Sequence, residues 1–160
     1  KSVRRKLSAI SHEFEGKAVL LVDDSIVRGT TSAQIVEMAR DVGARKVYFA
    51  SAAPPVRHPN VYGIDMPAVD EFIANGRTID EINGIIGSDR LFYQTLEDLI
   101  DVTSIGPSPP ERFDASCFNG EYVTQDIDAT YLETLRSRRN DAAKQSSAPT
   151  EVVGLHNGEA

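Results

Sequence analysis

The chain lacks the features that mark several classes of protein. It has a single cysteine, Cys117, so it cannot form an internal disulfide, and its cysteine content cannot by itself build a structural zinc or iron–sulfur site. A reducing cytoplasm is therefore the expected compartment. No apolar run is long enough to cross a membrane, and we expect neither a membrane span nor a secretory signal.

Positive charge is also scarce. The 17 Lys and Arg residues are outnumbered by 24 Asp and Glu residues, and the net charge of −7 argues against nucleic acid as a partner. The exception is the N-terminal end, where Lys1, Arg4, Arg5 and Lys6 form a basic cluster that suits either a small polyanion or a solvated helix end. With 160 residues and no initiator Met, we expect one domain that belongs to a longer chain.

Residues 19–32, which read VLLVDDSIVRGTTS, predict a strand, a loop and the start of a helix. Residues 19–22 are aliphatic throughout, which is typical of a strand buried on both faces. A helix is predicted over residues 31–42 and a second strand over residues 46–53. This order indicates the α/β class with a parallel sheet, in which the loop over residues 23–32 lies at the ligand-binding edge.

The following segments carry mainly structural signals. Residues 54–67 contain four prolines and predict a rigid extended loop that shapes a pocket wall. Thr78 and Glu81 form a capping-box pattern before a helix that Gly87 ends, and residues 96–102 predict a further short helix.

The adjacent acids Asp23 and Asp24 need a cation or hydroxyl donors beside them. A magnesium-bound sugar phosphate meets that need, because carboxylates ligate Mg²⁺, accept hydrogen bonds from ribose hydroxyls and stabilise positive charge on the sugar. The alternative is a turn in which Asp24 acts as a cap.

Hydroxyl side chains surround a glycine in the same loop. Ser25, Thr30, Thr31 and Ser32 flank Gly29, whose missing side chain permits close approach of an anion or a positive φ angle. The spacing matches neither a Walker A loop nor a dinucleotide-binding fingerprint. A phosphate monoester is therefore the predicted ligand, bound in a different kind of phosphate loop.

These residues carry a resemblance to a known family. The segment VLLVDDSIVRGTT resembles the phosphoribosyl pyrophosphate (PRPP) signature of type I phosphoribosyltransferases. Together with SVRRKL, YGIDMP and CFNGEYVT, it makes the chain, up to about residue 141, similar to the C-terminal part of the glutamine PRPP amidotransferases.

The resemblance implies the architecture. Residues 1–105 are expected to form the C-terminal half of a phosphoribosyltransferase domain with a partial parallel sheet. Residues 106–141 are expected to be an extension with short helices that packs on it, and residues 142–160 a disordered tail.

The resemblance also implies the reaction. A glutaminase domain outside this chain would release ammonia, which displaces pyrophosphate from PRPP to give 5-phosphoribosylamine, the first committed step of purine biosynthesis. Mg²⁺ is the implied cofactor, purine nucleotides are the implied feedback inhibitors, and a homo-oligomer is the implied assembly. We expect the chain on its own to be inactive.

The family's PRPP-binding positions map onto this loop. In this chain they are Asp23, Asp24, Ser25, Val27, Arg28, Gly29, Thr30, Thr31 and Ser32, with Asp23 and Asp24 also handling the metal. The basic residues Lys1, Arg4, Arg5 and Lys6 match the end of a flexible loop that closes over bound PRPP and excludes water.

The chain departs from the family pattern at one position. Some members hold an iron–sulfur cluster partly through a Cys-x-x-Cys pair, but Asp114 stands at the first position here and only Cys117 remains. We therefore expect no cluster. Because Cys117 is internal, we also expect no glutaminase activity from this chain.

The sequence leaves several interpretations open. Arg28 could approach a phosphate or be an exposed loop residue, and His58 is better explained by ordinary hydrogen bonding than by acid catalysis. Residues 62–67 could line a nucleotide pocket or pack. The whole chain could instead belong to a base-salvage phosphoribosyltransferase, which needs base-stacking aromatics, or to a PRPP-sensing regulatory module without catalysis.

Overall fold

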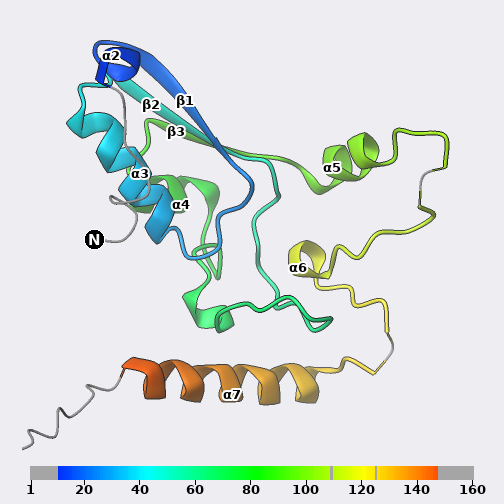
Figure 1. Cartoon of the computed structure of the whole chain (residues 1–160). Coiled ribbons are helices and arrows are strands. Elements are labelled where there is room, and N and C mark those ends of the chain that lie inside the picture. The colour runs from blue at the N-terminus through cyan, green and yellow to red at the C-terminus, as the bar shows by residue number, and fades with distance from the viewer. Residues whose placement is uncertain (1–10, 109, 125, 148–160) are drawn as a thin grey trace, which may run out of the picture.

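The computed structural model describes residues 11–108, 110–124 and 126–147 (Figure 1). Along the chain, the described elements are α2 (Ser11–Phe14), β1 (Ala18–Asp23), α3 (Thr30–Asp41), β2 (Lys46–Ser51), the 3₁₀ turn η1 (Val69–Glu71), α4 (Ile79–Ile86), β3 (Arg90–Tyr93), α5 (Leu96–Thr103), α6 (Ser116–Asn119) and α7 (Ala129–Ser147). No helix in these ranges combines the length and apolar character that crossing a membrane requires.

The three strands form a parallel sheet in the order β1-β2-β3. Leu21, Phe49 and Leu91 stand beside one another in its register. The predicted parallel α/β fold is confirmed, as are the first strand and helix to within a residue or two. The strand β3 was not predicted, because its four residues are too few to show a period.

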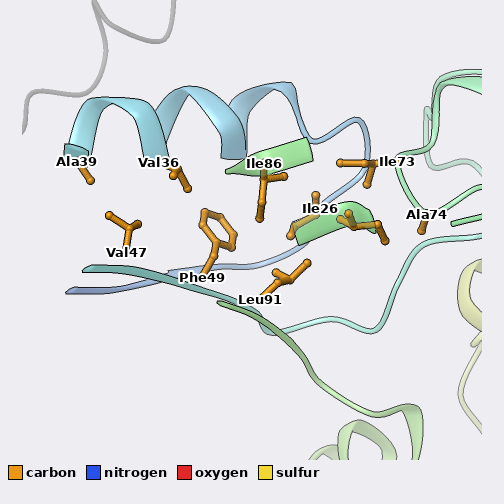
Figure 2. Packing of buried hydrophobic residues seen from close by; sticks show 10 residues of the cluster. Ile26, Val36, Ala39, Val47, Phe49, Ile73, Ala74, Ile86 and Leu91 are labelled. Carbon is orange, nitrogen blue, oxygen red and sulfur yellow. The ribbon is translucent and has the colours of Figure 1, made fainter. Parts of the chain in front are cut away.

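One face of the sheet is covered by α3 and α4, which lie together on the same side of the strands (Figure 1). In Figure 2, Val36 and Ala39 of α3 face Val47 and Phe49 of β2 across this layer, and Ile86 of α4 lies beside them. All five are at most 2% exposed. Burying a side chain such as Phe49 contributes about 1.5–3 kcal/mol, so this layer fixes the sheet and the ends of its strands.

The opposite face is open, and the prediction that residues 19–22 are buried on both faces is wrong. Leu20 and Val22 are 59% and 68% exposed, and Phe92 is 43% exposed. The register places Val22, Ala50 and Phe92 in one row across the strands. The apolar residues would allow other elements to pack on both faces of the strand, but within the described residues helices pack on only one face.

The helix α4 begins and ends as predicted. Thr78 Oγ1 accepts the N–H of Glu81 at 3.3 Å, and the Glu81 carboxylate accepts the N–H of Thr78 at 2.7 Å, which completes the capping box. Gly87 follows with φ of 76°, a left-handed conformation that glycine adopts without strain.

The last helix, α7, crosses the far side of the molecule from the sheet (Figure 1). Arg136 Nη2 and Asn140 Nδ2 donate to Asp70 at 2.7 and 2.9 Å, and Arg139 Nη2 donates to the carbonyl of Asn60 at 3.2 Å. With 19 residues, α7 is longer than the short C-terminal helices expected from the sequence, and it includes residues 142–147 of the predicted tail. The remainder of that tail lies outside the described residues.

Asp89 joins β2, α3 and the start of β3. Its carboxylate accepts the N–H of Val47 at 2.8 Å, Lys46 Nζ at 2.9 Å and Arg40 Nη2 at 3.1 Å. The Val47 hydrogen bond, followed by that of Lys46, lowers the pKa of Asp89 from 3.8 to about 2. The ionised carboxylate is thus favoured in the folded chain.

Replacing Asp89 by Asn should flatten the acid limb of the stability profile. Because the folded pKa lies below the unfolded one, the carboxylate contributes stability above 3.8 and loses that contribution as the pH falls toward about 2. The check is the thermal midpoint from about pH 2 to about pH 6. Asp101→Asn, at an exposed position on α5, is the matched control, and equal profiles for the two variants would contradict the role of Asp89.

Candidate functional site

A cavity of about 600 Å³ opens at the carboxyl end of β1. Its lining combines the loop after β1 with the Pro-rich segment and α6: residues 23–32, Ala53, Val56, Ile64, Asp65, Met66, Pro67, Cys117 and Phe118. All the predicted loop residues thus lie on one cavity, at the sheet edge where parallel folds bind ligands.

Both acids of the pair reach this cavity. The backbone N–H of Asp24 donates to Asp23 Oδ1 at 3.0 Å, and Ser25 Oγ donates to Asp24 Oδ1 at 3.1 Å. The carbonyl of Asp23 accepts the N–H of Ala52 at 2.9 Å, which continues the pairing of β1 with β2 up to the site. Both acids therefore line one cavity where β1 ends.

The N-terminus of α3 adjoins the same cavity without a side-chain cap. The N-cap residue is Gly29, which has no side chain to accept a hydrogen bond from the first N–H groups of the helix. The N–H groups of the first turn, Thr30, Thr31 and Ser32, have no carbonyl one turn earlier in the helix. Such a helix end attracts anions, because unpaired N–H groups and the helix dipole both favour negative charge there.

Gly29 is the residue that this loop geometry requires. Its φ is 75°, and a Cβ at this position would overlap Ile73 Cδ1 and lie 3.2 Å from Ile73 Cγ1. The N–H of Ile73 also donates to the carbonyl of Val27 at 2.8 Å. The conformation of the loop over residues 23–32 therefore depends on Ile73, a residue far along the chain that the sequence did not indicate.

Arg28 lines the cavity with its side chain 52% exposed, and its Nε donates to Glu71 Oε2 at 2.8 Å. This hydrogen bond is the main reason that the pKa of Glu71 lies below its usual value. The sequence offered no signal for Glu71, because the pairing spans 43 residues and depends on tertiary structure.

The Pro-rich segment forms part of the cavity wall through Val56 and residues 64–67. Asn60, only 2% exposed, shapes this wall because its Oδ1 accepts the N–H groups of Tyr62 at 2.9 Å and Ile64 at 3.0 Å. Tyr62 itself does not line the cavity, and its hydroxyl lies 3.0 Å from Thr124 Oγ1.

His58 and Cys117 occupy the region beside this wall. The His58 ring packs against Gly120, where a Cβ would lie 2.9 Å from Cε1, and burial followed by the neighbouring Arg57 lowers the pKa of His58. His58 is not among the cavity residues, whereas the half-buried Cys117 is. Burial raises the pKa of the Cys117 thiol, which keeps it protonated at neutral pH.

The basic cluster of Lys1, Arg4, Arg5 and Lys6 lies outside the described residues. Within the part of the chain that the structure describes, no three His, Cys, Asp or Glu side chains gather as a metal site. The charged residues that line the cavity are thus the acids Asp23, Asp24 and Asp65 and the base Arg28, and the uncapped end of α3 adjoins them.

No protein-family model matches the chain. The sequence is nevertheless 59% identical over 155 residues to an amidophosphoribosyltransferase of Escherichia coli, a match that covers 97% of this chain and 31% of that protein. The chain therefore spans about a third of the length of such relatives.

Solved structures agree with this relationship. A glutamine PRPP amidotransferase from B. subtilis, complexed with ADP and GMP, superimposes with a TM-score of 0.66 at 36% identity, over 82% of this chain and 31% of that one. A structure described as the allosteric regulatory enzyme of purine biosynthesis gives a TM-score of 0.67 at 38% identity, over 81% of this chain and 28% of that one. The predicted type I phosphoribosyltransferase fold is confirmed.

Proposed function

From its kinship with about a third of the amidophosphoribosyltransferase chain, we propose that this chain supplies the PRPP-binding half of such an enzyme. The observation that carries the proposal is the cavity at the end of β1, where two adjacent carboxylates and an uncapped helix N-terminus face one space. Neither the base-salvage reading nor the regulatory module is favoured, since the relatives are amidotransferases.

The two ends of the loop suit the two parts of a ribose phosphate. The first turn of α3, with the exposed Thr30 and Thr31, offers N–H and hydroxyl donors to the 5-phosphate. Asp23 and Asp24, one turn of the loop away, accept hydrogen bonds from the ribose hydroxyls. Ser25 and Ser32 complete the proposed set, together with the backbone of Val27 and Gly29.

The acid pair also fits Mg²⁺. This ion usually takes one or two carboxylates and completes its shell with water and substrate phosphates, so a protein cluster of three ligands is not required. Asp23 and Asp24 would hold it, and when bound it would neutralise charge on the pyrophosphate of PRPP.

In the proposed reaction, ammonia forms a bond to C1 of PRPP while the bond from C1 to the pyrophosphate oxygen breaks. Pyrophosphate leaves with the electron pair, and the new ammonium group releases a proton to water. The sugar carries positive charge as the bond breaks, and the carboxylates of Asp23 and Asp24 stabilise that charge. Binding and orientation by the loop supply the rest of the catalysis.

The proposed partners follow from the same relationship. A glutaminase domain supplies the ammonia, purine nucleotides inhibit the enzyme, and the enzyme acts as a homo-oligomer in the cytoplasm. The complex of the B. subtilis relative with ADP and GMP supports nucleotide binding. The basic residues Lys1, Arg4, Arg5 and Lys6 are proposed to shield bound PRPP from water.

The test is an assay of pyrophosphate release from PRPP by the protein at its full natural length. We expect release that requires ammonia or glutamine and Mg²⁺, and no turnover by the 160-residue chain alone. Release that requires a purine or pyrimidine base instead would contradict the proposal, and so would PRPP binding without any turnover.

A further inference from the structure

Residues at and just after η1 contact three consecutive residues, 27–29, of the loop that follows β1, which is the proposed phosphate loop. Ile73 N–H donates to the carbonyl of Val27, Glu71 accepts from Arg28, and the Ile73 side chain fills the space beside Gly29. Ile73 is 4% exposed and belongs to the hydrophobic core. The loop is therefore held against a rigid part of the molecule.

Both oxygens of the Glu71 carboxylate are engaged. Oε2 accepts Arg28 Nε at 2.8 Å, and Oε1 accepts the backbone N–H of Ala68 at 3.3 Å as part of the η1 turn. The Glu71 side chain is 35% exposed. A carboxylate fixed at both oxygens defines where its partner guanidinium lies.

The Arg28 guanidinium has donors to spare. Its Nε is bound to Glu71, whereas Nη1 and Nη2 have no partner within the described ranges. Arg28 also lines the cavity. A guanidinium presents its donors in a planar fork that matches two oxygens of a phosphate. Because a half-exposed ion pair contributes little to stability, the contact with Glu71 has orientation as its main effect.

We propose that Glu71 is a positioning residue, which holds Arg28 at the cavity mouth so that Nη1 and Nη2 bind the 5-phosphate of the ribose ligand. The inference rests on the proposed function, because that function supplies the phosphate monoester. It adds a residue that lies outside the phosphate loop and outside the cavity lining.

The test combines Glu71→Gln with Arg28→Ala in the full-length protein. Glu71→Gln should raise KM for PRPP about tenfold while kcat changes less than about twofold, because a charge-assisted contact is misaligned. Arg28→Ala should raise KM by about the same factor or more. In the Arg28→Ala background, Glu71→Gln should have no further effect. Independent, multiplying effects on KM, or an unchanged KM in Glu71→Gln, would overturn the inference.

A matched control is Glu81→Gln. Glu81 also accepts a backbone N–H at the start of a helix, from Thr78 at 2.7 Å, but it lies away from the cavity. We expect this variant to leave KM unchanged. Melting temperatures of both variants report folding, and Glu71→Asp provides a second variant that keeps the charge.

Calorimetric binding of ribose 5-phosphate separates this inference from the proposed function. Glu71→Gln and Arg28→Ala should each weaken binding about tenfold, without additivity, whether or not the protein turns over PRPP. Failure of turnover with this binding pattern would contradict the proposed function alone. Turnover with ribose 5-phosphate affinity unchanged by either variant would overturn the role of Glu71 alone.

Discussion

Asp23→Asn and Asp24→Asn are each expected to lower kcat/KM for PRPP by about two to three orders of magnitude in the full-length protein, because each would remove a charge that the proposed reaction uses to stabilise the transition state. Asn is the informative replacement. Its side-chain oxygen still accepts the N–H of Asp24 at position 23, or the Ser25 hydroxyl at position 24. The variants thus keep the local hydrogen bonds and lose only the negative charge.

The measurement is initial-rate pyrophosphate release with ammonia as the nucleophile, so that any glutaminase step is bypassed. Asp80→Asn, at an exposed position in the first turn of α4, controls for a general loss of charge. Melting temperatures should stay close to that of the parent, since both acids lie at the surface of the cavity. Rates unchanged in both variants would rule out the role proposed for the pair.

Gly29→Ala is expected to lower both the stability of the fold and the proposed affinity for PRPP. An alanine with a φ of 75° is strained by about 1–2 kcal/mol. Its Cβ would also overlap Ile73 Cδ1, and overpacking of this kind costs about 1–3 kcal/mol. Together the two effects lower the free energy of unfolding by about 2–5 kcal/mol and displace the loop from the end of α3.

Urea unfolding with two further variants separates these contributions. Gly76→Ala is the matched control, because Gly76 has a φ of 65° but nothing within 4 Å of the added Cβ, so it carries only the backbone strain. Adding Ile73→Val to Gly29→Ala removes the overlapping Cδ1 and should restore part of the PRPP affinity. Equal losses of stability for Gly29→Ala and Gly76→Ala would show that the overlap has no effect.

Local signals made much of the fold predictable. The aliphatic run before Asp23, the helix after Gly29 and the capping box at Thr78 each depend on residues close in sequence, and the structure has all three elements. The strand β3 was missed because its four residues lie between a helix end and a loop, without a detectable period.

The site residues that could not be predicted from the sequence are those that only the tertiary structure brings to the site. Neither Glu71 nor Ile73 lies near the loop over residues 23–32 in sequence, and only the fold brings them against Arg28 and Gly29. The sequence also could not show that Cys117 reaches the cavity from α6, since a lone cysteine gives no indication of its neighbours. The predicted burial of residues 19–22 on both faces was wrong for a similar reason. An apolar pattern shows that both faces of the strand could be buried, but it does not show whether another element packs on each face.

The attachment of α7 has a mechanical consequence. Arg136 and Asn140 of α7 donate hydrogen bonds to Asp70. The next residue along the backbone is Glu71, which accepts a hydrogen bond from Arg28. A single peptide bond thus joins Asp70, which holds α7, to Glu71, which holds Arg28 in the loop after β1. A displacement of α7 would therefore reach Arg28 at the cavity through Asp70 and Glu71, without passing through the hydrophobic core.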